Sequence, residues 1–144
     1  NLTPIATAYA DQVKQAGITL KITNAAADSY YSQIWMSKPL MVSYWFTGRP
    51  VDQLLNQIFR SGSSYNESAW SNKQFDQLLD AARADTNDAS RRLKYQDAQR
   101  LIQADGADQT PVFGDRLVGL SETVVNYDEY GFEFDYLAIG LKEG

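Results

Sequence analysis

The stretch MVSYWFTGRPVDQLL, residues 41–55, decides which fold the sequence predicts. Its first half belongs to an almost continuous apolar run over residues 40–46, which is typical of a parallel strand covered by helices on both faces. Residues 47–49, Thr-Gly-Arg, interrupt this run, and Pro50 then opens a helix at a position where the missing N–H of proline costs nothing. The stretch therefore predicts an inner strand that ends beside the start of a helix.

The residues before this stretch predict a helix, a strand and another helix. Residues 3–4, Thr-Pro, are typical of a helix start with threonine as the cap, and Gly17 suits the position that ends the helix. Apolar residues alternate with threonine and lysine over residues 18–23, as in a strand with one buried face. Asp28 is expected to cap a second helix that ends before Pro39. Helix, strand, helix, strand in this order predicts an α/β layer with right-handed crossovers.

Three further helices are expected downstream, at about residues 50–61, 72–84 and 89–104. Each carries one apolar stripe: Val51, Leu54, Leu55, Ile58 and Phe59 in the first, Phe75, Leu78, Leu79 and Ala82 in the second, and Leu93, Tyr95, Ala98, Leu101 and Ile102 in the third. Short strands at residues 111–113 and 117–120 and an irregular aromatic tail are expected to follow. The chain shows no internal repeat and no low-complexity linker, so a single domain over residues 1–144 is predicted.

The composition excludes several kinds of site. The 144 residues include no cysteine and no histidine, which removes disulfides, thiolate nucleophiles, the usual zinc sites and every triad with an imidazole base. A net charge of −5 disfavours a nucleic-acid surface. No apolar run reaches about 18 residues, so no membrane-spanning helix is expected. We expect no metal and no cofactor. The first residues, Asn-Leu-Thr-Pro without an initiator Met, suggest a piece of a longer, processed protein.

The end of the predicted inner strand is the expected binding site, because ligands of open α/β sheets bind beyond the carboxyl ends of the strands. Trp45 is expected to expose its ring toward the crevice. Arg49 precedes a helix N-terminus, where free N–H groups and the helix dipole favour an anion, and a guanidinium would strengthen binding of a carboxylate or phosphate. Thr47 and Gly48 are expected to let backbone amides approach a ligand closely.

A purely structural role is open for each of these residues. Trp45 could pack under a helix, and Thr47 and Gly48 could form a plain turn. Arg49 could be a surface arginine that pairs with Asp52 or with a carboxylate elsewhere.

Paired carboxylates for glycosidase-like chemistry are a further candidate. Asp76 and Asp80, and also Glu129 and Glu133, lie at a spacing of four that could place each pair on one helix face. Solvated surface acids are the commoner interpretation of such pairs. The Asn-x-Ser triplet at Asn66 is interpreted as a chance match to a glycosylation signal.

Several blocks of sequence, taken together, resemble those of one protein family. They are GRP at 48–50 after a Trp-containing strand, WSNKQFDQLLDAAR at 70–83, RRLKYQDAQ at 91–99 and PVF at 111–113. In this order and spacing, residues of about 6–113 resemble the C-terminal part of extracellular solute-binding proteins of family 5, the peptide, nickel and opine receptors of bacterial ABC importers. The last thirty residues are not aligned.

The resemblance implies one lobe of a periplasmic-binding-protein-like (class II) fold, an α/β lobe with a mixed sheet flanked by helices. This lobe would close on its ligand together with an N-terminal lobe of the same protein, without catalysis. The implied partners are a small-molecule or peptide ligand and the membrane permease of an importer, and self-association of the isolated lobe is left open. The implied location is periplasmic or extracellular, with a lipoprotein anchor of the full-length form also left open.

By position, the resemblance implies that the ligand contacts Trp45, Thr47, Gly48, Arg49, Tyr44 and Trp35. Peptide-binding relatives often carry an aspartate in this loop that pairs with the amino group of the peptide. Here Arg49-Pro50-Val51 stands in the loop and Asp52 comes later, so an anionic or opine-like ligand stays open beside a peptide.

Two other functions are considered. A small carboxylate-using hydrolase would need two acids that converge on a pocket at roughly 5 to 10 Å. A protein-interaction module would need a contiguous exposed apolar patch of more than a few hundred Å².

Overall fold

The computed structural model describes residues 2–45, 48–106, 108–111, 117–127, 129–130, 133–134 and 137–142. The chain divides into two compact units, Asn1–Trp45 and Phe46–Gly144, which are described in turn. The single domain predicted for residues 1–144 stays a prediction. None of the helices in the described ranges combines the length and the apolar character that crossing a bilayer requires.

The first unit contains the helix α1 (Thr3–Lys14), the short 3₁₀ helix η1 (Ala27–Ser29) and the helix α2 (Tyr30–Gln33). The predicted helix start is nearly right, but Leu2 is the N-cap and makes no side-chain cap bond. The hydroxyl of Thr3 instead donates to Oδ1 of Asn24 at 3.0 Å. Gly17 follows α1 with a φ of +79°, the left-handed conformation expected of the glycine that ends a helix.

The two strands predicted in this unit are wrong. Residues 18–23 and 41–45 form no strand, and Ile18 is 51% exposed. No residue described in the unit is fully buried. A strand requires a neighbouring chain that satisfies its backbone, and alternation in sequence cannot supply that neighbour. The carbonyl oxygen of Val42 accepts from the hydroxyl of Tyr30 at 3.0 Å, so this bond is made with a side chain.

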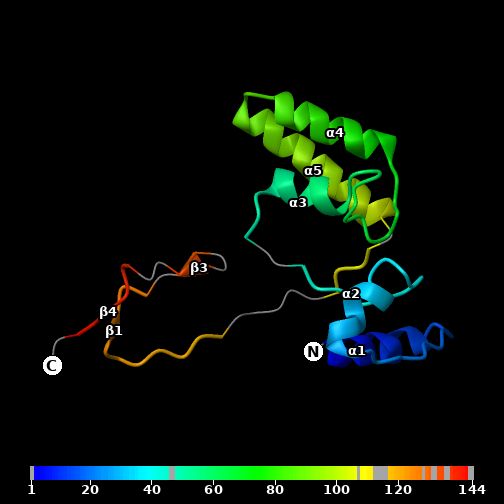
Figure 1. Ribbon diagram of the computed structural model, residues 1–144. Helices are drawn as coiled ribbons and strands as arrows, with labels where there is room; N and C mark the ends of the chain where they lie inside the picture. The colour runs from blue at the N-terminus through cyan, green and yellow to red at the C-terminus, as the bar shows by residue number, and fades with distance from the viewer. Residues whose placement is uncertain are drawn as a thin grey trace. The chain divides into compact units, whose positions relative to one another are not determined.

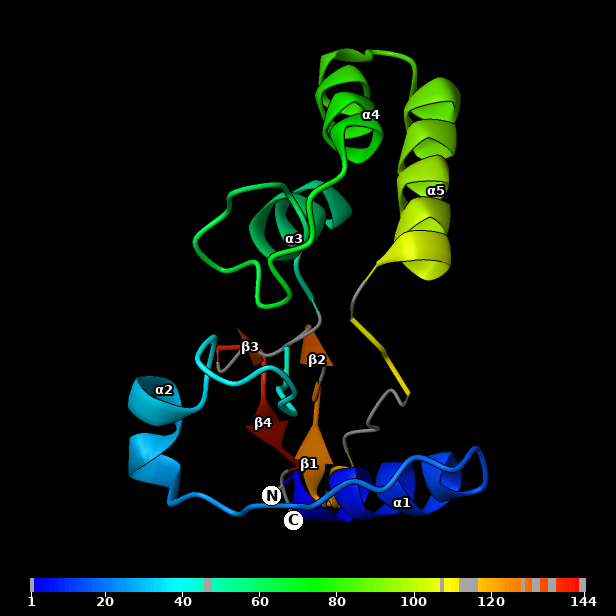
Figure 2. The same ribbon diagram turned by 90° about the vertical axis from the view of Figure 1, so that its right-hand side faces the viewer.

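The second unit is built around α3 (Val51–Ile58), α4 (Lys73–Ala84) and α5 (Asp88–Asp105). The helices α4 and α5 run side by side, joined by a short turn (Figure 1), as the view turned by 90° also shows (Figure 2). All three helices were predicted, close to these bounds. Their buried cluster consists of Leu55, Phe75, Leu79, Ala82, Tyr95 and Ala98.

The predicted stripes of these helices agree with the buried and partly buried side chains except at two residues, Val51, which is 41% exposed, and Leu93. Phe75 and Leu79 are almost completely buried, and burial of a side chain of this size contributes about 2 to 3 kcal/mol. Leu93 was expected in the core but is 58% exposed. It lies two residues before Tyr95, on roughly the opposite side of the helix, since successive residues turn by about 100°.

Asparagine side chains cap the N-termini of α4 and α5. Oδ1 of Asn72 accepts from the amide N of Phe75, and Oδ1 of Asn87 accepts from the amide N of Ser90, each at 3.0 Å. The cap at Asn72 agrees with the helix start predicted at about residue 72. Such caps are worth about 1 kcal/mol each, because they satisfy amides that have no partner within the helix.

The C-terminal region forms a nested antiparallel hairpin, where an irregular tail was expected. Strand β1 (Val124–Val125) pairs with β4 (Gly140–Leu141), and β2 (Glu129–Tyr130) pairs with β3 (Glu133–Phe134). The strand predicted at residues 117–120 does not form, and the one predicted at 111–113 lies largely outside the described residues.

The predicted fold class is therefore wrong. The described residues form helices and two small antiparallel ladders, not the mixed sheet flanked by helices of an α/β periplasmic-binding-protein-like lobe. The three helices of the second unit were predicted correctly. The helix expected between Asp28 and Pro39 is instead reduced to η1 and the four residues of α2, and Asp28 is the N-cap of neither. The error is in the apolar runs that were assigned to inner strands.

Candidate functional site

The six predicted ligand contacts fall in both units. Trp35, Tyr44 and Trp45 belong to the first unit, and Gly48 and Arg49 belong to the second. Thr47 lies outside the described residues. Tyr44 is 57% exposed, whereas both tryptophans are partly buried, so the ring expected to be most open, that of Trp45, is not the most open of the set.

A row of three aromatic rings lies on and beside α2. The ring centroids of Tyr30 and Tyr31 are 5.2 Å apart, those of Tyr31 and Trp35 are 5.9 Å apart, and both pairs are edge-on. The hydroxyl of Tyr30 donates to the carbonyl of Val42, which ties this row to the segment that carries Tyr44 and Trp45. The first unit thus connects Trp35 to that segment through neighbouring aromatic residues.

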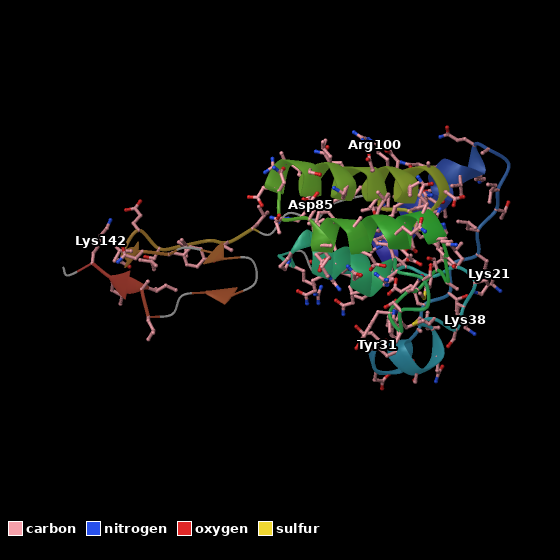
Figure 3. All side chains as sticks on the ribbon, turned by 90° about the horizontal axis from the view of Figure 1, so that it is seen from above. Lys21, Tyr31, Lys38, Asp85, Arg100 and Lys142 are labelled. Atoms are coloured by element: carbon pink, nitrogen blue, oxygen red, sulfur yellow. The ribbon has the colours of Figure 1, made fainter. Side chains whose placement is uncertain are left out.

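The sequence led to a wrong prediction for Tyr31, one member of this row. The helix predicted between Asp28 and Pro39 places Tyr31 on the same side as Ile34 and Trp35. It is 74% exposed, and Figure 3 shows it projecting from α2. Because the helix is only four residues long, a helical periodicity that needs two or more turns could not place its side chain.

Gly48 adopts a conformation that favours glycine, which fits both the plain turn and the predicted approach of backbone amides to a ligand. Its φ is +90°, in the region that side chains disfavour, and the residue is exposed. It comes two residues before Pro50, the N-cap of α3. The chain therefore turns at Gly48 and enters α3 through Arg49.

The carboxylate of Asp52, in the first turn of α3, accepts hydrogen bonds from two other helices. Oδ2 accepts from Nη2 of Arg83 on α4 at 2.6 Å and from its Nε at 3.2 Å. Oδ1 accepts from the hydroxyl of Tyr95 on α5 at 2.9 Å and from Nδ2 of Asn56 at 3.0 Å. These four bonds use about all the acceptor sites of a carboxylate.

This arrangement is relevant to the pairing with Asp52 that was considered for Arg49. The arginine that pairs with Asp52 is Arg83, which lies 31 residues further along the chain. Partial burial raises the pKa of Asp52, but the hydrogen bonds from Arg83, Tyr95 and Asn56 and the charge of Arg83 outweigh it and hold the pKa below its ordinary value. Burial and the neighbouring Asp52 raise the pKa of Tyr95. The group is therefore an ionised acid held by a neutral phenol and a cation.

A second set of bonds joins the other end of α3 to α4. Arg60 donates through both Nη atoms to Asp80, at 2.8 and 3.1 Å, and Oδ1 of Asp76 accepts from the amide N of Ser61 at 3.1 Å. The hydrogen bond from Arg60, followed by its charge, lowers the pKa of Asp80. The two acids considered for glycosidase-like chemistry are thus engaged in joining helices.

The remaining acid pair shares no helix face, because Glu129 and Glu133 begin two paired strands, β2 and β3. Asp85 lies at the turn between α4 and α5, where a hydrogen bond from Lys94 is the first cause that holds its pKa far below the ordinary value (Figure 3). Within the ranges that the structure describes, no cluster of three or more acids is arranged to hold a metal ion.

The loop between α3 and α4 is held by Asn66, a residue interpreted as incidental in the sequence. Only 4% of it is exposed, and its Nδ2 donates to the carbonyl oxygens of Arg60 and Trp70 at 3.2 and 2.7 Å. The sequence signal that could have identified it is an asparagine inside a polar loop, since asparagine can satisfy backbone groups that a loop leaves unpaired.

Asp108, beyond the end of α5, lies in a different electrostatic setting. Burial, followed by the charge of Glu67, raises its pKa above the ordinary value of 3.8. Nearby, Oδ2 of Asp105 accepts from the ring N–H of Trp70 at 3.2 Å. This end of the helical unit therefore gathers negative charge.

Comparison of the chain with protein-family models, with curated proteins and with solved structures found no match.

Proposed function

We propose that this chain is part of the substrate-binding component of an ABC importer and captures a small solute, such as a peptide or an opine-like compound, by closure of a cleft. The proposal starts from the family blocks in the sequence. It does not include the mixed sheet, which the structure contradicts. Its mechanism is non-covalent: contacts divided between two parts of the receptor exclude water from the solute when they close.

One observation supports the proposal more strongly than any other. Residues of separate blocks that the resemblance rests on converge at the start of α3. Arg83, from the block at 70–83, and Tyr95, from the block at 91–99, both bind Asp52, which follows the GRP block by two residues. Hydrophobic packing alone would not require two polar groups from distant blocks to meet beside that third block.

The proposed solute contacts are those of the sequence analysis. Gly48 gives the backbone its sharp turn, and Arg49 supplies positive charge at the approach to a helix N-terminus, where a carboxylate of the solute would be favoured. Tyr44, Trp45 and Trp35 would contact the apolar parts of the solute. Thr47 completes the proposed set.

The proposed partners follow from the same role. They are a second lobe that supplies the other wall of the cleft and a membrane permease that receives the solute. The proposed location is periplasmic or extracellular, where such a receptor meets its solute.

Isothermal titration calorimetry tests the proposal. The chain is titrated with trialanine and with octopine, an opine that carries carboxylates, up to millimolar concentration. We expect weak binding, because this part of the receptor supplies only some of the contacts. Arg49→Ala is expected to weaken octopine binding about tenfold, the cost of one lost charge-assisted hydrogen bond.

Arg92→Ala, which removes an exposed arginine from α5, is the control with the same change of charge and should bind octopine like the wild type. Absence of heat from both compounds would overturn the proposed function. Equal weakening by the two arginine variants would remove Arg49 from the site and leave only a general effect of charge.

A further inference from the structure

We propose that Asp52, Arg83 and Tyr95 form a clasp that positions the segment Gly48–Arg49–Pro50 for its solute, so that the two distant residues Arg83 and Tyr95 are positioning residues of the binding site. The inference rests on the proposed function. It assigns a role in that site to side chains on α4 and α5 that the sequence analysis treated as core or surface.

Connectivity gives the first step. Pro50 is the N-cap of α3 and Asp52 lies in the first turn, so only two residues separate Arg49 from the residue that carries the clasped carboxylate. The amide N of Leu54 donates to the carbonyl of Pro50 at 3.0 Å, which fixes Pro50 to that turn. Any displacement of the first turn of α3 therefore carries Arg49 with it.

The geometry of the clasp gives the second step. Arg83 reaches Asp52 through two nitrogens and Tyr95 through one hydroxyl, so the carboxylate is held from two helices at once. Tyr95 is only 7% exposed, and its ring belongs to the buried cluster that joins α4 to α5. A hydroxyl on a ring held in this way has little freedom, and the position it gives to Asp52 is correspondingly well defined.

The clasp holds a different part of α3 from the part held by hydrophobic packing. The hydrophobic contacts of α3 in the buried cluster come from Leu55, on the turn after Asp52, with Phe59 packed beside the cluster. They fix the middle and the end of the helix. Among the described bonds, those that reach the first turn of α3 from other helices are the bonds to Asp52. The polar clasp therefore constrains the first turn, which the apolar contacts do not hold.

The chain also offers a matched control. The pair Arg60–Asp80 joins the other end of α3 to the same helix α4, again through two donated hydrogen bonds. Breaking that pair removes an interaction between α4 and the residues that directly follow α3, at the end remote from Gly48. A role in stability would be shared by both pairs, whereas a role in positioning the approach to α3 belongs only to the clasp.

Tyr95→Phe and Asp80→Asn are compared by two measurements on the full chain. In backbone hydrogen exchange, Tyr95→Phe is expected to speed exchange within residues 48–55 more than within residues 56–60, and Asp80→Asn is expected to do the reverse. In calorimetry with octopine, Tyr95→Phe is expected to weaken binding about tenfold, by the loss of one hydrogen bond to a charged group. Asp80→Asn should leave binding unchanged.

The double variant Tyr95→Phe with Arg49→Ala gives the readout that a merely structural role would not change. If Tyr95 acts through Arg49, the double variant binds octopine no more weakly than Arg49→Ala alone. Additive losses, or exchange that quickens equally at both ends of α3 in Tyr95→Phe, would overturn the inference. Absence of binding of both octopine and trialanine by the wild type overturns the proposed function instead, and the exchange pattern then decides whether the clasp positions the start of α3.

Discussion

Nδ2 of Asn66 lies 2.7 Å from the carbonyl oxygen of Trp70, so one side chain closes the loop that connects α3 to α4. The same nitrogen reaches the carbonyl of Arg60 at the other end of the loop, and Oδ1 accepts from the hydroxyl of Ser68 at 3.1 Å. A buried amide used in this way replaces the water that the loop carbonyls would otherwise bind.

Asn66→Ala is therefore expected to lower the free energy of unfolding by about 2 kcal/mol, because it leaves buried loop carbonyls without a donor. Urea unfolding followed by circular dichroism measures this change. Ser64→Ala, at an exposed position in the same loop, should change the free energy by less than about 0.5 kcal/mol. Equal effects of the two substitutions would show that Asn66 does not hold the loop.

Ala69 offers a substitution that should stabilise the chain. Its φ is +55°, a left-handed conformation that costs an ordinary residue roughly 1 to 2 kcal/mol and glycine little. Part of this gain is lost because glycine makes the unfolded chain more flexible. Ala69→Gly is thus expected to raise the free energy of unfolding by about 0.5 to 1 kcal/mol.

The matched control is Ala81→Gly, the same chemical change at an exposed position inside α4. There glycine is expected to lower the free energy of unfolding by about 1 kcal/mol. Thermal unfolding of both variants should show shifts of opposite sign. A destabilised Ala69→Gly would mean that the backbone of Ala69 carries no strain that glycine relieves.

Removal of the clasped acid is expected to cost more than removal of a surface acid. Asp52→Ala leaves the hydroxyl of Tyr95, a residue that is only 7% exposed, without the carboxylate that accepts its hydrogen bond, and should lower the free energy of unfolding by about 2 kcal/mol. Asp97→Ala breaks an ion pair with Arg100 on the outer surface of α5 and should cost at most about 0.5 kcal/mol. Urea titration distinguishes the two values, and a comparable loss in both variants would contradict the role of Asp52 as the acceptor that holds Arg83 and Tyr95.

The helices could be predicted from the sequence because their signals are local. Asn72 begins α4, and Phe75, Leu79 and Ala82 repeat at helical spacing inside it, so each choice of residue points to the same structure. The core of the second unit follows almost entirely from such stripes. Val51 and Leu93 are the exceptions, since an exposed apolar residue cannot be distinguished from a further member of the stripe by composition alone.

The strands could not be predicted because their signals are not local. Apolar residues at 40–46 fit an inner strand, but a ladder depends on a partner that the run itself does not specify. The candidate site could be predicted only in part, for the same reason. Gly48 could be identified from its sequence neighbours, whereas the convergence of Arg83 and Tyr95 on Asp52 joins residues 31 and 43 positions away and required the structure.

Asp108→Asn tests the pH dependence of stability at the acidic end of the helical unit. Because burial and Glu67 raise its folded-state pKa above 3.8, its contribution to stability is fully present below that value and is lost as pH rises through the folded pKa. Ionised Asp108 therefore destabilises the fold near neutral pH. The variant should unfold at higher urea than the wild type at about pH 7, and the two should converge at about pH 3, where the carboxyl is neutral. Asp11→Asn, the same charge change at an exposed position on α1, controls for net charge. An equal gain in both variants, or a gain that persists at acidic pH, would mean that the local setting of Asp108 is not the cause.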